Sequence, residues 1–408
     1  MELELISKLD SGEIKLYEIE KLTKDVNKAA EIRRKFIERK TGIRMDHIGN
    51  YSIDLNLTLN RNIENSIGCV QIPVGIVGPL KVKGDYANGD FYIPIATTEG
   101  ALVASVNRGC SALNEGGGVY TKIIDDKMSR APLLKVKNIR HALEVLEWIK
   151  EHYKQIKEVF ESKSKHLKLK DIKHWIIGKN LWLRFEADTG DAMGMNMVTI
   201  ASDLATQYII ENNKDVKILA LSGNLCTDKK TSAINWILGR GKTVIAEATI
   251  PREVVKRKLK TTPEEAADVA MRKNILGSAF VHSYGLNAHF SNVIAGIFLA
   301  TGQDAAQIVE SSMGISNAEV DEEGDLYVSV YLPSLEVGTV GGGTHLPTQA
   351  ECLKILNCYG SGEPPGSNSK KFAEIIAAAT LAGEVSLLSA LAAGHLAKAH
   401  EKLGKQKA

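Results

Sequence analysis

Four separate segments of the sequence place titratable side chains among glycines and other small residues, where packing alone gives no reason for charge. Their chemically versatile members are Glu99, Lys229, Asp304 and His400. Carboxylic acids and imidazoles transfer protons near neutral pH, and a fixed lysine stabilises negative charge on oxygen. The four side chains are therefore candidates for acid–base and electrostatic catalysis.

Each segment taken alone also has a structural explanation. Glu99 can be explained as a carboxylate at a helix N-terminus, and the loop around Lys229 as a solvated surface loop. Asp304 is different, because it follows the window 274–303, which contains no Asp, Glu, Lys or Arg, and a buried carboxylate is costly unless it is paired. His400 and the histidine five positions before it are about 140° apart around a helix, so they are not expected to face one site together.

Several familiar cofactor and metal motifs are absent. Gly241-Lys-Thr243 resembles the end of a phosphate-binding loop, but Trp236 stands where that motif requires glycine. The sequence contains no Gly-x-Gly-x-x-Gly fingerprint after a strand, no His-Glu-x-x-His motif and no Gly-x-Ser-x-Gly motif. Cys352, Cys358 and His345 are spaced too loosely for a zinc site, so we expect no metal.

Composition and charge exclude several classes of protein. The 408 residues are 44% hydrophobic and 25% charged, as in soluble globular proteins. A net charge of +2 gives no reason to expect nucleic acid, and five scattered cysteines fit a reducing cytoplasm better than a secreted disulfide scaffold. Polar residues within the window 274–303 argue against a membrane span, so we expect a helix there, buried in a large soluble domain.

Hydrophobic periodicity predicts an α+β protein in three parts. These are a helical N-terminal domain over 1–60, a small domain over 132–221, and a large domain formed by 61–131 and 222–408. The small domain follows the order β-α-β-β-α-β of a ferredoxin-like sandwich. We expect its strands at 133–136, 175–177, 181–187 and 216–220, its helices over 142–160 and 197–208, and the last helix of the chain over roughly 371–402.

Taken together, the polar segments resemble the motifs of 3-hydroxy-3-methylglutaryl-CoA reductases. The resemblance runs in order from about residue 60 to residue 400. It rests on Glu64-Asn-Ser-Ile-Gly68, Ile72-Pro-Val-Gly75, Thr97-Thr-Glu-Gly100, Gly190-Asp-Ala-Met-Gly-Met-Asn196, Asp228-Lys-Lys230, Gly302-Gln-Asp304, Gly338-Thr-Val-Gly-Gly-Gly343 and Gly394-His-Leu-Ala-Lys-Ala-His400. It implies a large α/β domain built around a long buried central helix, with an inserted ferredoxin-like small domain and a helical N-terminal domain.

The resemblance implies an NADPH-dependent, two-step reduction of 3-hydroxy-3-methylglutaryl-CoA to mevalonate and CoA, the committing step of isoprenoid synthesis by the mevalonate pathway. In that reaction Lys229 stabilises the carbonyl oxyanion, and His400 protonates the departing CoA thiolate. Glu99 gives a proton to the aldehyde oxygen, and Asp304 couples to both Glu99 and Lys229.

The resemblance also assigns binding residues position by position. The hydroxymethylglutaryl group is assigned to Arg130, Ser222, Asp228, Lys230, Lys273 and Asn292. CoA is assigned to Tyr17, Ser105, Asn107, Arg108, His289 and Ser386. The dinucleotide is assigned to Asp191, Met193, Met195, Asn196, Gly341 and Gly342, with Ser164 and Lys165 beside the 2′-phosphate. We therefore expect NADPH, although the stretch around Ser164 is also typical of a basic solvated turn.

The family's active site is shared between two subunits, so the resemblance implies a homodimer. Eukaryotic members carry a preceding membrane domain and a phosphorylatable serine six residues after the catalytic histidine, whereas this chain begins at the catalytic portion and has Gln406 at that position. We expect a soluble cytoplasmic enzyme of archaeal or bacterial type. The rival interpretations are the NAD-dependent degradative direction, an acyl-CoA hydrolase or lyase, and a non-catalytic CoA-binding protein.

Overall fold

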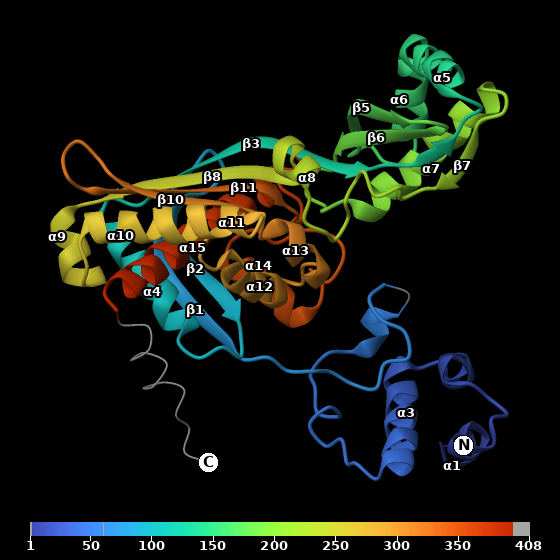
Figure 1. The fold of residues 1–408 in the computed structure, drawn as a ribbon. Helices are drawn as coiled ribbons and strands as arrows, with labels where there is room; N and C mark the ends of the chain where they lie inside the picture. The colour runs from blue at the N-terminus through green and yellow to red at the C-terminus, as the bar shows by residue number, and fades with distance from the viewer. Residues whose placement is uncertain (1, 60, 395–408) are drawn as a thin grey trace.

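The computed structural model describes residues 2–59 and 61–394, and it confirms the predicted α+β class (Figure 1). Eleven strands form one continuous sheet. Helices lie beneath the larger part of this sheet, and the first helices of the chain form a separate lobe (Figure 1). The functional site is positioned by the junction between the larger and smaller parts of the sheet.

The N-terminal helices pack around a small core of their own. The longest of these N-terminal helices is α3 (Val26–Thr41). The carboxylate of Asp25 accepts the backbone N–H groups of Asn27 and Lys28 and so caps its start, and Gly42, with φ 73°, ends it. The core consists of Leu5, Ile6, Leu9, Ile19, Ala29 and Ile32. The elements are α1 (Glu2–Ser11), η1 (Leu16–Glu18), α2 (Ile19–Thr23), α3 (Val26–Thr41) and η2 (Leu55–Thr58).

The larger part of the sheet has the strand order β2-β1-β3-β8-β11-β10-β9. Neighbouring strands are antiparallel except β1 with β3 and β9 with β10, which are parallel. The strands are β1 (Val74–Lys83), β2 (Asn88–Ala96), β3 (Val119–Arg130), β8 (Gly241–Ile250), β9 (Gly285–Leu286), β10 (Gly314–Val320) and β11 (Leu326–Leu335).

Strand β3 joins the two parts of the sheet. Its residues 120–127 pair with β8, and its last residues 128–130 pair with β6 of the smaller part. Arg130 therefore lies where the two parts meet. The smaller part has the antiparallel order β7-β4-β6-β5. Its strands are β4 (Leu133–Lys135), β5 (Lys168–Ile177), β6 (Asn180–Asp188) and β7 (Lys217–Ala220), and its helices are α5 (Ile139–Glu151), α6 (Tyr153–Glu161) and α7 (Met195–Asn212).

The predicted β-α-β-β-α-β succession is present, with three corrections. The expected helix over 142–160 is two helices, because the backbone of His152 turns to φ −105° and ψ 18° while its ring stacks on Trp148. Strand β5 begins at Lys168 rather than at 175, since its charged first half lies on an edge strand that pairs only with β6. Strand β6 is not half exposed: Arg184 and Glu186 are both buried and bond to each other.

The long buried helix is α15 (Ser367–Ala392), not the uncharged window. Window 274–303 was expected to form one buried helix, and this was wrong. It is divided by a turn around His282, which has φ 54°, and Phe280 and Val281 in that stretch are exposed. Uncharged composition therefore marks both buried and surface positions here. The window contains the last residues of η4 (Ala270–Gly277), followed by α11 (Ser278–Phe280), β9 and α12 (Phe290–Thr301).

Helix α15 forms the centre of the main core. It packs against α4 (Leu102–Glu115), α12 and the face of β8, and Figure 1 shows it beneath the sheet. Among the described residues it alone has the length and apolarity of a membrane-spanning helix, but 83% of its apolar window is buried inside the protein, as in the core helix of a soluble protein. The other helices are α8 (Ala233–Leu238), α9 (Arg252–Val254), η3 (Val255–Leu259), α10 (Pro263–Val269), η5 (Ala305–Gln307), α13 (Ile308–Ser311) and α14 (Pro347–Ile355).

Candidate active site

A cavity of about 850 Å³ lies where the two parts of the sheet meet. Its size is within the range of small-molecule binding sites. It brings together residues from three predicted groups that are far apart in the sequence. They are the catalytic Lys229 and Asp304, the substrate-binding Arg130 and Asp228, and the cofactor-binding Met193, Met195, Asn196, Gly341 and Gly342.

Lys229 and Asp304 form an ion pair in this cavity. The Nζ atom of Lys229 lies 3.0 Å from Oδ2 of Asp304, and both side chains are partly exposed. The hydrogen bond to Asp304 raises the pKa of Lys229 above its ordinary value of 10.5. The site therefore presents a cation at neutral pH, which is the group needed to stabilise an oxyanion.

Asp304 is fixed by the local turn at the end of α12. Gly302 ends that helix with φ 71°, and Oδ1 of Asp304 accepts the backbone N–H of Ala306 at 3.0 Å. One carboxylate oxygen thus caps η5, and the other faces Lys229. Asp304 is therefore paired, as expected for a carboxylate after a long uncharged stretch, but it is partly exposed rather than buried.

The loop that carries Lys229 has an unusual backbone. Asn224, Thr227 and Lys229 have φ values of 66°, 48° and 59°, a left-handed region that residues with a Cβ rarely adopt. Buried side chains hold the loop from below. Nδ2 of Asn235 donates to the carbonyl oxygens of Cys226 and Thr227, so the conformation is imposed by its surroundings.

Arg130 and Asp228 face each other beside Lys229. Their Nη1 and Oδ2 atoms are 3.6 Å apart, and Nε of Arg130 donates to Thr199 at 2.9 Å. Burial favours protonation of Asp228, but Arg240, Gln307 and Arg130 outweigh it and lower the pKa of Asp228. Asp228 is therefore an ionised group that orients the arginines around it.

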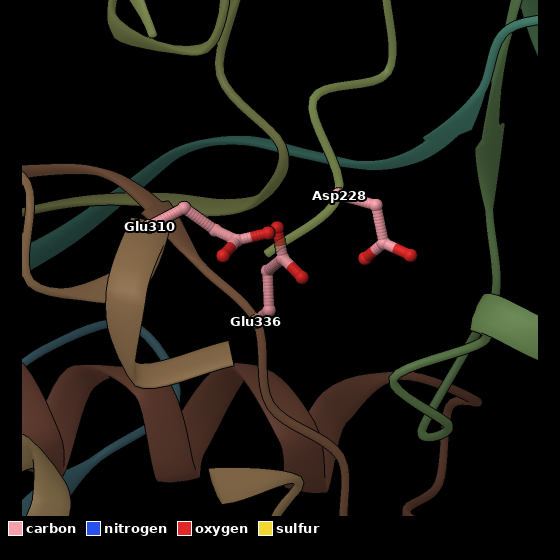
Figure 2. Close-up of side chains that lie close together, drawn as sticks. All are labelled: Asp228, Glu310 and Glu336. Atoms are coloured by element: carbon pink, nitrogen blue, oxygen red, sulfur yellow. The ribbon is translucent and has the colours of Figure 1, made fainter. Parts of the chain in front are cut away.

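Three carboxylates lie close together at the cavity: Asp228, which lines it, and the buried Glu310 and Glu336, which do not (Figure 2). Such a group could hold a metal ion, but a guanidinium already provides the positive charge. Nη1 of Arg240 lies 2.8 Å from Glu310 and 2.7 Å from Glu336, and its Nη2 lies 3.2 Å from Asp228. We define these four residues as the Arg240 cluster.

Glu99 lines a second, smaller cavity of about 230 Å³ together with Asn292. The Nδ2 atom of Asn292 donates to Glu99 at 3.3 Å. Leu299 lines both cavities, so they are neighbours. Within the described part of the chain, Glu99 makes no hydrogen bond or ion pair with Lys229 or Asp304. Its predicted coupling to Asp304 stays a prediction, and His400 lies outside the described residues.

The residues predicted for CoA form separate groups. Ser105 and Arg108 of α4 contact Ser386 of α15, at 2.9 Å between the two hydroxyl oxygens and 3.0 Å from the guanidinium Nε. The Asn107 side chain instead accepts the N–H of Gly78, which lies where the pairing of β1 with β2 is irregular. His289 lies at the start of α12, and its backbone N–H donates to Glu384 of α15. Tyr17 is an exposed residue of the N-terminal lobe.

The cofactor-binding predictions are brought together only in part. Asp191 is buried, and its carboxylate accepts the backbone N–H groups of Gly362, Gly366 and Ser369 at 2.8–2.9 Å. It anchors the start of α15 rather than facing the cavity. Ser164 and Lys165 lie in the turn between α6 and β5, outside the residues that line the cavity.

Three predicted substrate residues also lie outside the cavity lining. Ser222 contacts the thiol of Cys226 at 3.6 Å. Lys230 donates to the carbonyl oxygen of Asp228 at 3.1 Å, and Lys273 of η4 donates to the adjacent Asn274. The structure thus joins some predicted residues in one cavity and leaves others at its margins.

The sequence reasoning missed the buried charges that support the site. Arg240, Glu310 and Glu336 are inaccessible to solvent and far apart in the sequence: Arg240 directly precedes β8, Glu310 lies in α13, and Glu336 directly follows β11. The one available signal was a single acidic residue inside an apolar run, as in Leu335-Glu-Val337. It also missed Arg61 and Asn62, which line the cavity, Asn62 donating to the carbonyl oxygen of Gly342 at 3.1 Å.

Known proteins with similar sequences and folds point to one family. The model of the family described as hydroxymethylglutaryl-coenzyme A reductase matches residues 29–405. The chain is 62% identical over 404 residues to the 3-hydroxy-3-methylglutaryl-coenzyme A reductase of Pyrococcus abyssi, over 98% of this chain and 99% of that protein. It is 54% identical over 407 residues to that of Methanocaldococcus jannaschii, over 98% and 99% of the two chains.

A similar fold is found in a solved structure of the class II 3-hydroxy-3-methylglutaryl-CoA reductase from Streptococcus pneumoniae, bound to NADPH in open conformations. Its TM-score is 0.65 at 20% sequence identity, and the match covers 83% of this chain and 88% of that chain. At this identity the likeness concerns the fold.

Proposed function

Since the chain belongs to the hydroxymethylglutaryl-coenzyme A reductase family, whose members reduce 3-hydroxy-3-methylglutaryl-CoA to mevalonate, we propose that it performs this reduction with NADPH in two hydride steps. The observation that carries the proposal is the Lys229–Asp304 ion pair in a cavity that also contains Met193, Asn196 and the glycines 341 and 342. A fixed cation and a nucleotide-sized space meet at one place.

The residues present fit a dinucleotide. Gly341 and Gly342 have φ values of 79° and 54°, and no neighbouring backbone crowds the space where a side chain at 341 would stand. Ala192 and Val340 form a β-bridge that joins the two glycine-rich segments. Backbone can therefore approach a phosphate-bearing ligand closely. When bound, NADPH supplies hydride.

The protein's own groups perform the remaining chemistry. Lys229 stabilises the oxygen that becomes negative as the thioester is reduced, and Asp304 keeps the ammonium charged and oriented. Arg130 binds the substrate carboxylate beside Asp228. Glu99, held by Asn292, gives a proton to the aldehyde oxygen, and His400 protonates the CoA thiolate.

We prefer NADPH to NADH because Ser164 and Lys165 offer a hydroxyl and a cation for a 2′-phosphate. Their turn lies beside Gly190, the first residue of the predicted cofactor motif, since a Cβ at Gly190 would stand 3.8 Å from His166. The solved relative from Streptococcus pneumoniae is described as bound to NADPH. The NAD-dependent degradative direction remains the rival within the family.

We also propose a cytoplasmic homodimer in which a second copy completes the site. Met271, Leu276, Phe280 and Val281 are exposed apolar residues on one stretch near Lys273, with Phe280 86% exposed. Such a surface is typical of an interface. The mass in solution, measured by light scattering, tests this proposal, and a monomer that retains full activity would contradict it.

The test of the reaction measures NADPH and NADH oxidation with 3-hydroxy-3-methylglutaryl-CoA side by side. We expect about two NADPH oxidised per CoA released. Lys229→Ala should abolish turnover, and Lys150→Ala, an exposed lysine of α5, should not change it. Preference for NADH would indicate the degradative direction. Release of thiol without oxidation of either cofactor would indicate a hydrolase or lyase.

A further inference from the structure

The backbone N–H of Lys229 is bound by a buried carboxylate. Lys229 has φ 59°, and its N–H donates to Oε1 of Glu310 at 2.8 Å. Glu310 lies in α13 and is inaccessible to solvent. A buried N–H group is costly to leave without an acceptor, so this hydrogen bond can hold a backbone conformation that lysine rarely adopts.

Glu310 is itself fixed by the Arg240 cluster. The same Oε1 atom accepts Nη1 of Arg240 at 2.8 Å, and Arg240 in turn bonds to Glu336 and Asp228. Figure 2 shows the carboxylates of Glu310 and Glu336 pointing toward one another, with Asp228 to one side. The backbone of Lys229 is therefore attached to a buried network of charged side chains.

The two ends of Lys229 are held by one short segment. Asp304, which binds Nζ, precedes η5, and Glu310, which binds the N–H, lies in α13 immediately after it. Because η5 and α13 are continuous, the distance between these two acceptors is set by local structure. Any shift of the Lys229 backbone would move Nζ relative to Asp304 and the cavity.

We propose that Glu310 is a positioning residue for Lys229, fixing the left-handed backbone from which the ammonium reaches the reacting oxygen. The proposal rests on the proposed function for the role of Lys229. Glu310 does not itself line the cavity, and it acts through Lys229, the residue that it holds.

Glutamine is a suitable conservative replacement for Glu310. Burial raises the pKa of Glu310 and raises that of Glu336 further, while Arg240 opposes both effects. Both pKa values are therefore shifted toward the neutral form of the carboxyl group. A neutral amide at 310 is compatible with this environment, and it keeps the acceptor oxygen for the N–H of Lys229.

The experiment compares Glu310→Leu, Glu310→Gln and Glu336→Gln, the last being a matched control that changes the same cluster without contacting Lys229. Glu310→Leu should lower kcat about 30-fold with KM for the CoA substrate within about threefold, because misplacement of the cation affects the transition state. Both glutamine variants should stay within about threefold of wild type in kcat. Equal losses in all three variants would overturn the proposal, as would unchanged kcat in Glu310→Leu.

Hydrogen exchange at the Lys229 amide provides a readout that is independent of activity. We expect protection in the wild type and in Glu310→Gln, and at least about tenfold faster exchange in Glu310→Leu. If Glu310→Leu does not fold, Glu310→Asp keeps the charge and withdraws the oxygen, and the same exchange result is expected. Unchanged protection would refute the positioning role whatever the enzyme reduces, whereas an inactive wild type with the expected exchange pattern would refute only the proposed function.

Discussion

The ammonium of Lys229 and the carboxylate of Asp304 are 3.0 Å apart. Lys229 lies in a loop with left-handed backbone conformations, and Asp304 follows the turn at Gly302. The relationship predicts how activity depends on pH. Because Asp304 raises the pKa of Lys229 above 10.5, the wild-type amine should stay charged throughout the neutral and mildly alkaline range.

Asp304→Asn should therefore move the alkaline limb of the kcat profile to lower pH and lower kcat about 100-fold at neutral pH. The direction of the shift follows from the raised pKa of Lys229. The interaction between the charged amine and Asp304 is present below this pKa and is lost as the pH rises through it. The measurement is kcat from about pH 7 to about pH 11.5, a range that includes the ordinary titration of lysine. An unchanged alkaline limb would show that another group governs it.

A second prediction concerns Asp191, which sequence reasoning placed at the cofactor. Its carboxylate accepts three backbone N–H groups at the start of α15, so Asp191→Ala should destabilise the fold by about 3 kcal/mol. Thermal unfolding of Asp191→Ala and Asp191→Asn checks this, and the asparagine variant, which retains an acceptor oxygen, should lose less. An unchanged melting temperature with weaker NADPH binding would instead place Asp191 in direct contact with the cofactor.

These examples show how much could be predicted from the sequence. Motif order predicted which segments meet, and Lys229, Asp304, Arg130 and Asn196 do line one cavity. A residue's place in a motif could not show whether its side chain faces the cavity or supports the surrounding structure. Both kinds of side chain are positioned by the same backbone segment. Asp191 lies within a motif that resembles a cofactor-binding motif, and yet its carboxylate accepts a backbone N–H group of α15.

The long uncharged window shows the same limit for the fold. Absence of charge predicted a single buried helix, but His282 and the exposed Phe280 divide the window. Burial depends on what packs against a segment, which composition does not specify. In contrast, α15 is buried although it contains Glu374 and Glu384, because backbone N–H groups satisfy both carboxylates.

Glu374 provides a third prediction. This buried residue in α15 accepts the N–H groups of Asp85, Tyr86 and Ala87 at 3.2, 2.9 and 2.6 Å and so holds the turn between β1 and β2. Glu374→Ala leaves these donors without a partner and should cost about 3 kcal/mol of folding free energy. Glu374→Gln should cost less, since its oxygen can still accept two of them.

The pH dependence of Glu374 has a defined sign. Burial raises its pKa above 4.5, although the three N–H groups oppose this. A raised pKa in the folded state contributes stability that is present below the unfolded pKa and is lost as pH rises through the folded pKa. The stability difference between wild type and Glu374→Gln should therefore shift against the wild type as pH rises above about 4.5. Parallel stability curves for the two proteins would contradict this.

The last prediction concerns metal. Asp228, Glu310 and Glu336 have the spacing of a metal site, but the guanidinium of Arg240 already pairs with all three carboxylates. Removal of divalent ions with a chelator should leave both activity and melting temperature unchanged. Arg240→Met, which removes the buried cation and keeps an apolar side chain, should destabilise the protein by about 4 kcal/mol, since it leaves buried carboxylates unpaired.

If chelation alone lowered the melting temperature, the carboxylates would be shown to bind a metal, and the Arg240 cluster would need another description. Arg257→Met, which removes an exposed arginine paired with Glu115, serves as the control and should change stability by less than about 1 kcal/mol.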